Sequence, residues 1–122
     1  MNYPLIFDEN GALFFCRTKE DAEKYLEVED ILENEYVAYD SDGRLLQLRV
    51  ERTYKPILFG LRKKMLPKII IECAETTPAH RNELRNKLLE FYKKITSDAK
   101  VDPDISLQDL LAKVIEKSGY CH

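Results

Sequence analysis

The feature that most constrains the fold is a change in the spacing of apolar residues near residue 75. Before this point apolar residues form short runs or alternate with polar ones. Leu46, Leu48 and Val50 are an example of alternation, and this period of two is typical of strands with one buried face. After it they recur every three or four residues over 84–95 and 107–115, the spacing of amphipathic helices. The chain therefore predicts an α+β fold in which helices cover an antiparallel β-sheet.

Turn residues divide the strand-forming part into two hairpins. Asn10 and Gly11 separate the apolar runs 5–7 and 12–16, and this dipeptide supplies the positive φ angles of a tight hairpin turn. The sequence Asp-Ser-Asp-Gly at 40–43 separates a strand over 36–39 from the alternating strand that follows. We therefore expect two consecutive β-hairpins.

The region from 53 to 73 predicts an irregular segment followed by one more strand. Pro56, Gly60 and Pro67 interrupt 53–67, so this part is expected to be an irregular connection with at most one short strand. Residues 68–73 contain three consecutive isoleucines and are expected to form an interior strand, covered on both faces.

Capping residues and apolar stripes predict three helices, one short helix near 19–27 and two longer ones that reach about 96 and 118. The expected N-caps are Thr18, Thr77 (with Pro78 as the first helical residue) and Ser106, and the expected C-cap is Gly119. In the short helix, Ala22, Tyr25 and Leu26 would form the inner face. Residues 1–122 are expected to form a single α+β domain, with the short helix and the two C-terminal helices on the sheet.

Composition favours a cytoplasmic protein. Apolar residues make up 44% and charged residues 34% of the 122 residues, which is typical of a globular domain that needs no disulfides. No apolar run approaches the roughly 20 residues of a membrane-spanning helix, and the first residues do not resemble a signal peptide. Cys16, Cys73 and Cys121 are odd in number and widely spaced, which indicates reduced thiols, and Cys16 and Cys73 are expected in the core.

Candidate catalytic and metal-binding residues are few. Cys73 and His80 could form a nucleophile and a base, but a capping or surface role for His80 is the favoured interpretation. Zinc needs about four ligands at characteristic spacing, and Cys121 with His122 offers only two. Phosphate-binding glycine loops are absent, and the turn at 40–43 lacks the closing glutamate of a calcium loop. We therefore expect no enzyme activity, no cofactor and no metal.

Charge divides the chain into unlike parts, although the net charge is only −3. Residues 1–50 hold 12 acidic and 5 basic residues, whereas residues 51–100 hold 6 acidic and 12 basic ones. The segment 27–42 has no basic residue, and its acids and tyrosines form the predicted partner-binding set. These residues are Glu27, Glu29, Asp30, Glu33, Glu35, Tyr36, Tyr39, Asp40 and Asp42.

The acidic segment has two interpretations. It could be a solvated connection between a helix and a strand, with at least one tyrosine in the core. It could also be a docking surface for a basic partner, in which acids speed and orient the encounter and tyrosines anchor it. The basic region 62–94 offers an alternative, a nucleic-acid-associated or regulatory module, but a sequence pI of about 5.5 argues against a general nucleic-acid binder.

The stretches TKEDAEKYLE at 18–27 and EYVAYDSDGRLL at 35–46 carry a family resemblance. Over about residues 5–50 the chain resembles bacterial immunity proteins, which accompany the secreted toxins of polymorphic and contact-dependent systems. The resemblance implies a cytoplasmic, non-catalytic protein that binds a cognate toxin and blocks its active site or substrate entry. Many such toxins are nucleases with basic surfaces, which an acidic inhibitor would suit. Self-association through the helix near 106–118 and a small enzyme using Cys73 or His80 are further hypotheses.

Overall fold

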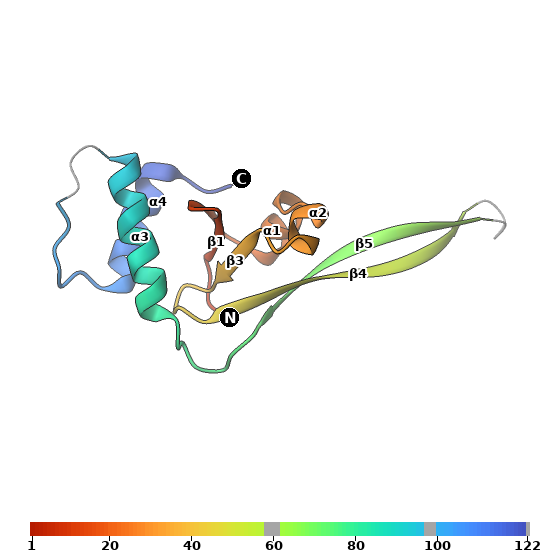
Figure 1. Ribbon diagram of the computed structural model, residues 1–122, viewed down its shortest axis with the longest axis horizontal. Coiled ribbons are helices and arrows are strands. Elements are labelled where there is room, and N and C mark those ends of the chain that lie inside the picture. Colours follow the sequence, from red (N-terminus) through yellow and green to blue (C-terminus); the bar gives the residue numbers. More distant parts are fainter. Residues whose placement is uncertain (58–61, 97–99, 122) are drawn as a thin grey trace.

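A five-stranded antiparallel sheet with two helices on each face forms the part of the chain that the structure describes. The computed structural model describes residues 1–57, 62–96 and 100–121, with the backbone alone for residues 53–57 and 62–66 (Figure 1). The elements are β1 (Leu5–Glu9), β2 (Ala12–Cys16), α1 (Lys19–Tyr25), α2 (Val28–Leu32), β3 (Tyr36–Tyr39), β4 (Leu45–Ile57), β5 (Arg62–Cys73), α3 (Arg81–Ile95) and α4 (Leu107–Ser118). The strand order is β2-β1-β3-β4-β5. This arrangement confirms the α+β prediction.

The alternation of side chains along the strands creates two separate cores. On one face Ile6, Phe15 and Tyr39 pack against α3 and α4. On the other face Leu5 and Phe7 pack with the buried residues of α1 and α2. Successive residues of β1 therefore bury toward opposite faces, which is why residues 5–7 are all apolar.

The predicted turn and two of the predicted helix starts are confirmed. Asn10 and Gly11 have φ angles of 53° and 93° in the hairpin between β1 and β2. The Thr18 hydroxyl accepts a hydrogen bond from the Asp21 amide at 3.0 Å, and the Ser106 hydroxyl accepts one from the Asp109 amide at 3.1 Å. These bonds satisfy backbone donors that the first helical turn leaves unpaired.

Other helix predictions are corrected. The helix α2 was not expected, and α1 ends at Tyr25, whose side chain is exposed and does not belong to the inner face. The long helix α3 begins at Arg81, and Thr77 lies in the preceding loop. The His80 amide donates to the Gly43 carbonyl at 3.0 Å, so the start of α3 is attached to the turn before β4.

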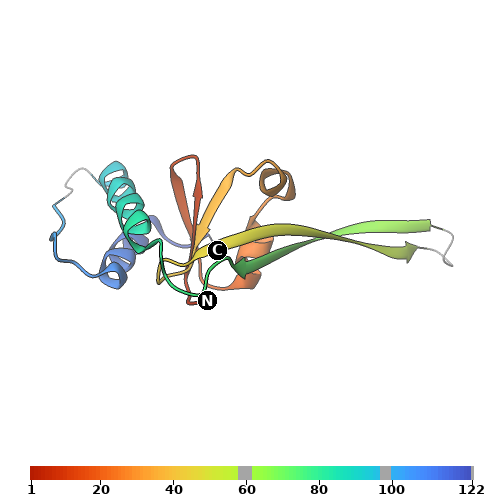
Figure 2. The ribbon, with the colours of Figure 1, turned by 60° about the horizontal axis from the view of Figure 1, so that its bottom comes forward.

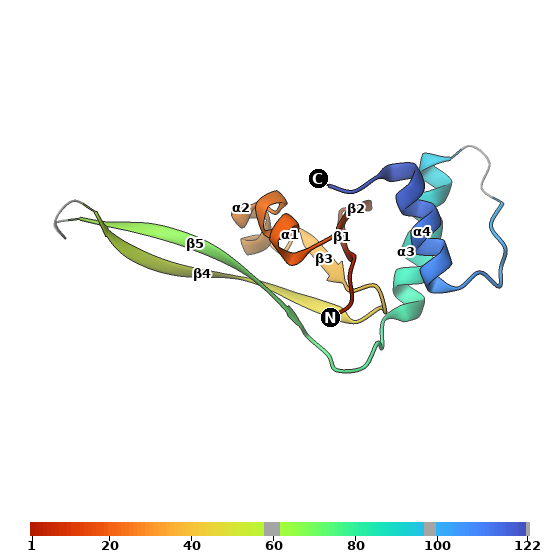
Figure 3. The ribbon, with the colours of Figure 1, turned by 180° about the vertical axis from the view of Figure 1, so that it is seen from behind.

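The largest correction concerns 53–57 and 62–67, which are not irregular. Strands β4 and β5 pair continuously from Leu46–Cys73 to Ile57–Arg62, while only the first two residues of β4 pair with β3. The outer part of this hairpin, residues 51–57 and 62–68, is called the arm. It extends from the sheet on the side opposite α3 and α4, with no helix beside its outer half (Figures 2 and 3).

Strand β5 is an edge strand, so the prediction of an interior strand over 68–73 is wrong. Ile69 and Ile71 are buried under the helices α1 and α2, but Ile70 faces the other side and is only half-buried. Cys73 is exposed and does not belong to the core, whereas Cys16 is fully buried. Gly60, one of the expected interruptions, lies outside the described residues.

Candidate partner-binding surface

The strand β3 separates the predicted binding residues into two groups. Tyr36 and Ala38 lie on the face of α1 and α2, and Tyr39 lies on the face of α3 and α4. Because side chains alternate along a strand, residues three positions apart cannot share a face. The segment 27–42 therefore does not form one continuous surface.

Tyr39 belongs to the core. Its ring is fully buried, and its hydroxyl donates to Glu83 of α3 at 2.8 Å. The Lys87 ammonium lies 5.1 Å from the ring centroid and also pairs with Asp8 at 2.8 Å. Burial raises the pKa of Tyr39 to about 12. This tyrosine stabilises the contact between α3 and the sheet and offers no exposed anchor.

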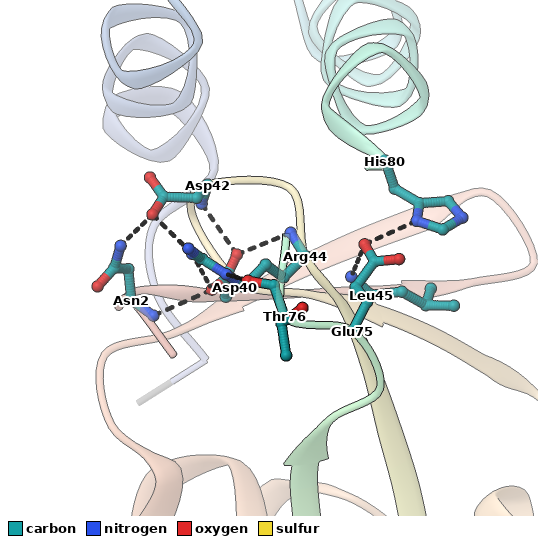
Figure 4. Close-up of polar contacts among 8 residues, drawn as sticks. All are labelled: Asn2, Asp40, Asp42, Arg44, Leu45, Glu75, Thr76 and His80. Carbon is teal, nitrogen blue, oxygen red and sulfur yellow. Dashed lines mark hydrogen bonds and ion pairs between the residues drawn. The ribbon is translucent and has the colours of Figure 1, made fainter. Parts of the chain in front are cut away.

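Asp40 is a structural residue in the turn between β3 and β4 (Figure 4). Its carboxylate is fully buried and accepts hydrogen bonds from the backbone amides of Asn2, Asp42 and Arg44 at 3.1, 3.0 and 2.9 Å. The Arg44 guanidinium lies 3.3 Å from it and 2.9 Å from Asp42. Arg44 lowers the pKa of Asp42. Both carboxylates are committed to holding the turn.

The remaining predicted residues gather around α2. Glu27 is its N-cap residue, Ile31 points into the core, and Glu29, Leu32 and Glu33 are exposed. Glu29 and Asp30 lie in the first turn, where the helix dipole favours negative charge. Asn34, with φ of 57°, ends the helix in the left-handed conformation. The exposed carboxylates therefore project from a short, well-terminated helix.

An aromatic cluster lies beside these acids. The Tyr36 hydroxyl donates to Asp30 at 3.3 Å and accepts from the Glu27 amide at 3.4 Å, and burial raises the pKa of Tyr36 to about 12. Phe14 packs between Tyr36 and Tyr25, with ring centroids 6.0 and 4.7 Å away. Tyr25 fixes one side of the cluster while 44% of its own surface stays exposed.

We call this region the acidic–aromatic surface. Its members are Tyr25, Glu27, Glu29, Asp30, Leu32, Glu33, Glu35 and Tyr36. The sequence prediction missed Tyr25 and Leu32. Leu32 is 52% exposed because it follows the inward-pointing Ile31 by one position, and a short second helix would have been needed to foresee this.

A hollow adjoins the acidic–aromatic surface. Its volume is about 280 Å³, and it opens between α2 and the start of β4. Its lining includes Ile31, Tyr36 and Leu48 together with the polar Asn34 and Gln47. Because most of the exposed lining is polar, this hollow is suited to a polar side chain of a partner.

The basic region 62–94 is also divided. Its first part lies on the arm and its second part on α3, at opposite ends of the molecule (Figure 1). On α3 the Arg85 guanidinium donates to the carbonyl oxygens of Pro103 and Ile105, and Lys87 pairs with Asp8. These two bases therefore have structural roles. Residues 52–68, in contrast, hold six basic and no acidic residues.

The structure gives His80 a structural partner. Its Nδ1 lies 2.8 Å from Glu75, which also accepts the Leu45 amide at 2.8 Å (Figure 4). These contacts lower the pKa of Glu75, the Leu45 amide most strongly. In the described part of the chain, no hydrogen bond joins Cys73 to His80, and no group of three or more His, Cys, Asp or Glu side chains could hold a metal ion.

No helix among the described residues is long and apolar enough to cross a membrane. Comparison of the chain with family models, with curated proteins and with solved structures finds no match.

Proposed function

We propose that this protein is an immunity protein that neutralises a secreted toxin domain in the cytoplasm, and that it binds the toxin through the acidic–aromatic surface. The observation that carries the proposal is the arrangement around α2, where five carboxylates surround exposed aromatic and aliphatic side chains. The resemblance to immunity proteins over about residues 5–50 covers this surface.

The two kinds of residue in the surface would act at different stages of binding. Exposed carboxylates attract a cationic partner and orient it during the encounter. Tyr25, Leu32 and Tyr36 would then supply the apolar contact area, since aromatic residues are common energetic centres of interfaces. The protein exposes 7802 Å², and a standard interface takes about 800 Å² from each partner. The surface and the adjoining hollow need therefore cover only about a tenth of the protein.

Charge complementarity suggests what the partner looks like. A toxin that cleaves nucleic acid must hold phosphates with basic side chains, and an acidic inhibitor can occupy the same place. Blocking such a surface requires no catalytic group in the immunity protein.

Charge reversal tests the proposal. The partner is first captured by pull-down from the native source or taken from the neighbouring gene. We expect Glu29→Lys with Glu33→Lys to lower the association rate constant at least tenfold at low salt, because Glu29 is exposed on α2 and Glu33 is exposed at its C-cap. Added salt should narrow the difference, since the screening length falls from about 10 Å at 0.1 M to about 3 Å at 1 M.

The matched control reverses two exposed acids on the other helices, Glu90→Lys with Glu116→Lys. This variant has the same net charge as the Glu29→Lys, Glu33→Lys variant. It therefore separates the effect of charge at the binding surface from the effect of the protein's net charge. Equal association rates for the two double variants would refute the assignment of the binding surface.

The arm supports a second candidate function, the binding of nucleic acid. Its sequence concentrates six basic residues on a projecting two-stranded ribbon, and the DNA major groove admits such a ribbon. A mobility-shift assay of the whole chain at about 50 mM salt should then show binding that Lys63→Glu with Lys64→Glu weakens. No retained DNA or RNA would eliminate this candidate.

A further inference from the structure

Two cysteines that are 105 positions apart in the sequence meet at the edge of the sheet. The sulfur atoms of Cys16 and Cys121 are 2.7 Å apart, and both residues are free cysteines. Cys16 is fully buried at the end of β2, and Cys121 is half-buried in the segment that follows α4. This proximity is independent of the acidic–aromatic surface.

The backbone holds the two residues side by side. Gly119, with φ of 77°, ends α4 and turns the chain back toward the sheet. The Cys121 amide then donates to the Phe15 carbonyl at 2.8 Å, so that residue 121 lies along the outer edge of β2. The placement of the sulfur atoms thus follows from a hydrogen bond next to Cys16.

Neighbouring side chains fix the same segment on both faces of the sheet. Tyr120 packs against the core under α3 and α4, and the Arg17 guanidinium lies 4.3 Å from the centroid of its ring. Cys121 packs against the core on the opposite face. The segment 119–121 therefore wraps around the edge of β2 from one core to the other.

We propose that Cys16 and Cys121 form a redox modification site, which reacts with a low-molecular-weight disulfide such as oxidised glutathione to give an intramolecular disulfide. A disulfide needs Cα atoms within about 7 Å and suitably directed Cβ atoms, and residues on adjacent backbone segments can meet both conditions. The bond fastens the segment 119–121 to β2.

The reaction proceeds by two thiol–disulfide exchanges. The Cys121 thiolate attacks one glutathione sulfur, the glutathione S–S bond breaks, and one glutathione thiolate leaves. The Cys16 sulfur then loses its proton and attacks the Cys121 sulfur, which expels the second glutathione. Two cysteines lose two electrons and two protons, and one glutathione disulfide becomes two glutathione thiols.

Accessibility determines the order of these steps. Cys121 is half-buried and can reach a solvent-borne disulfide, whereas Cys16 is closed off from solvent. Burial raises the pKa of the Cys16 thiol, which further disfavours it as the first nucleophile. Cys73 is exposed and separate from this pair, so it serves as an internal reference thiol.

The test incubates the whole native chain with oxidised glutathione and maps its disulfides by mass spectrometry. We expect a product that has lost two hydrogens at the pair and yields a linked peptide containing Cys16 and Cys121. Cys73→Ser should form the same bond, and Cys121→Ser should leave Cys16 as a thiol. Cys16 itself is not replaced, because it is buried in the core.

A second measurement repeats the reaction in denaturant. If the fold aligns the two sulfurs, the ratio of intramolecular disulfide to Cys121–glutathione adduct falls at least about tenfold on unfolding. A stable adduct on Cys121 with Cys16 reduced in the native chain would overturn the proposal. So would a bond from either residue to Cys73, or an unchanged ratio in denaturant.

Discussion

Replacement of Asp40 offers the sharpest test of how the acidic segment is divided between structure and binding. Asp40→Ala removes a fully buried carboxylate that accepts three backbone hydrogen bonds and pairs with Arg44. Removing one partner of a buried ion pair costs about 3–5 kcal/mol. Arg44 keeps its second contact with Asp42, so we take the lower value.

The expected change in thermal stability follows from the size of the chain. At about 2.1 cal/mol/K per residue, the unfolding entropy of 122 residues is about 0.26 kcal/mol/K, so a loss of about 3 kcal/mol lowers Tm by about 12 °C. Urea titration followed by circular dichroism should show a lower midpoint with an unchanged slope.

Asp42→Ala is the matched control. Asp42 belongs to the same turn, but its side chain is 26% exposed and accepts no backbone amide in the network around Arg44. We expect it to cost about 1 kcal/mol or less, as partly exposed ion pairs do. If Asp40→Ala and Asp42→Ala lowered the unfolding free energy equally, the buried network would not be what holds this turn.

Three further predictions concern single positions. Gly43→Ala should destabilise the protein more than Gly119→Ala. The Gly119 variant should cost about 1–3 kcal/mol of unfolding free energy through backbone strain alone, since both glycines have positive φ. Only at Gly43 would an added Cβ also lie 2.6 Å from the Arg81 Cα, and equal losses in urea titration would contradict this. Because the pKa of Tyr39 is raised to about 12, its neutral form stabilises the fold below a pH of about 10, and this contribution is lost as the pH rises toward 12. The unfolding free energy of Tyr39→Phe should therefore fall less steeply than that of the original protein over this range. Parallel pH profiles of the two proteins would count against this prediction. Ser106→Ala should lower the unfolding free energy by about 1 kcal/mol, because α4 loses its N-cap hydrogen bond, and Ser106→Asn should recover most of this loss. An alanine variant as stable as the original protein would show that the cap contributes nothing.

Local chemistry explains what the sequence could predict. The turn at Asn10 and Gly11 and the caps at Thr18 and Ser106 each depend on residues within three positions of one another. The α+β class followed from the change of apolar period. The alternation from Leu46 to Glu51 correctly predicted one buried and one solvent-facing side of β4.

The prolines of the arm explain one failure. Pro56 and Pro67 indicated breaks, yet both lie within paired strands, opposite Lys63 and Arg52. Proline lacks an amide hydrogen and is tolerated where its nitrogen faces the unpaired edge of a strand. In an antiparallel two-stranded ribbon every second residue of each strand directs its nitrogen toward the open edge. The two proline pairs lie four residues apart along the ladder. Because hydrogen-bonded and non-hydrogen-bonded pairs alternate, both prolines occupy the same one of these two kinds of cross-strand pair.

The candidate site was only partly predictable because faces depend on tertiary structure. Tyr36 and Tyr39 could have been assigned to opposite faces from their spacing alone. The burial of Asp40 could not have been predicted from local spacing, because its hydrogen-bond partners include the amide of Asn2, 38 positions away. The meeting of Cys16 with Cys121 depends on α4 returning to the edge of β2, which no local pattern encodes.

Because β4 continues from the sheet into the arm, its local stability changes along its length. Leu46 of β4 lies between partners in β3 and β5, while the residues from Gln47 onward pair with β5 alone. An isolated two-stranded hairpin is only marginally stable in water. The free energy of local opening should therefore decrease along β4, from nearly the free energy of global unfolding at the start of the strand to nearly zero in the arm. The core does not set the length of the arm, so this hairpin can lengthen or shorten without disturbing the packing of the rest of the protein.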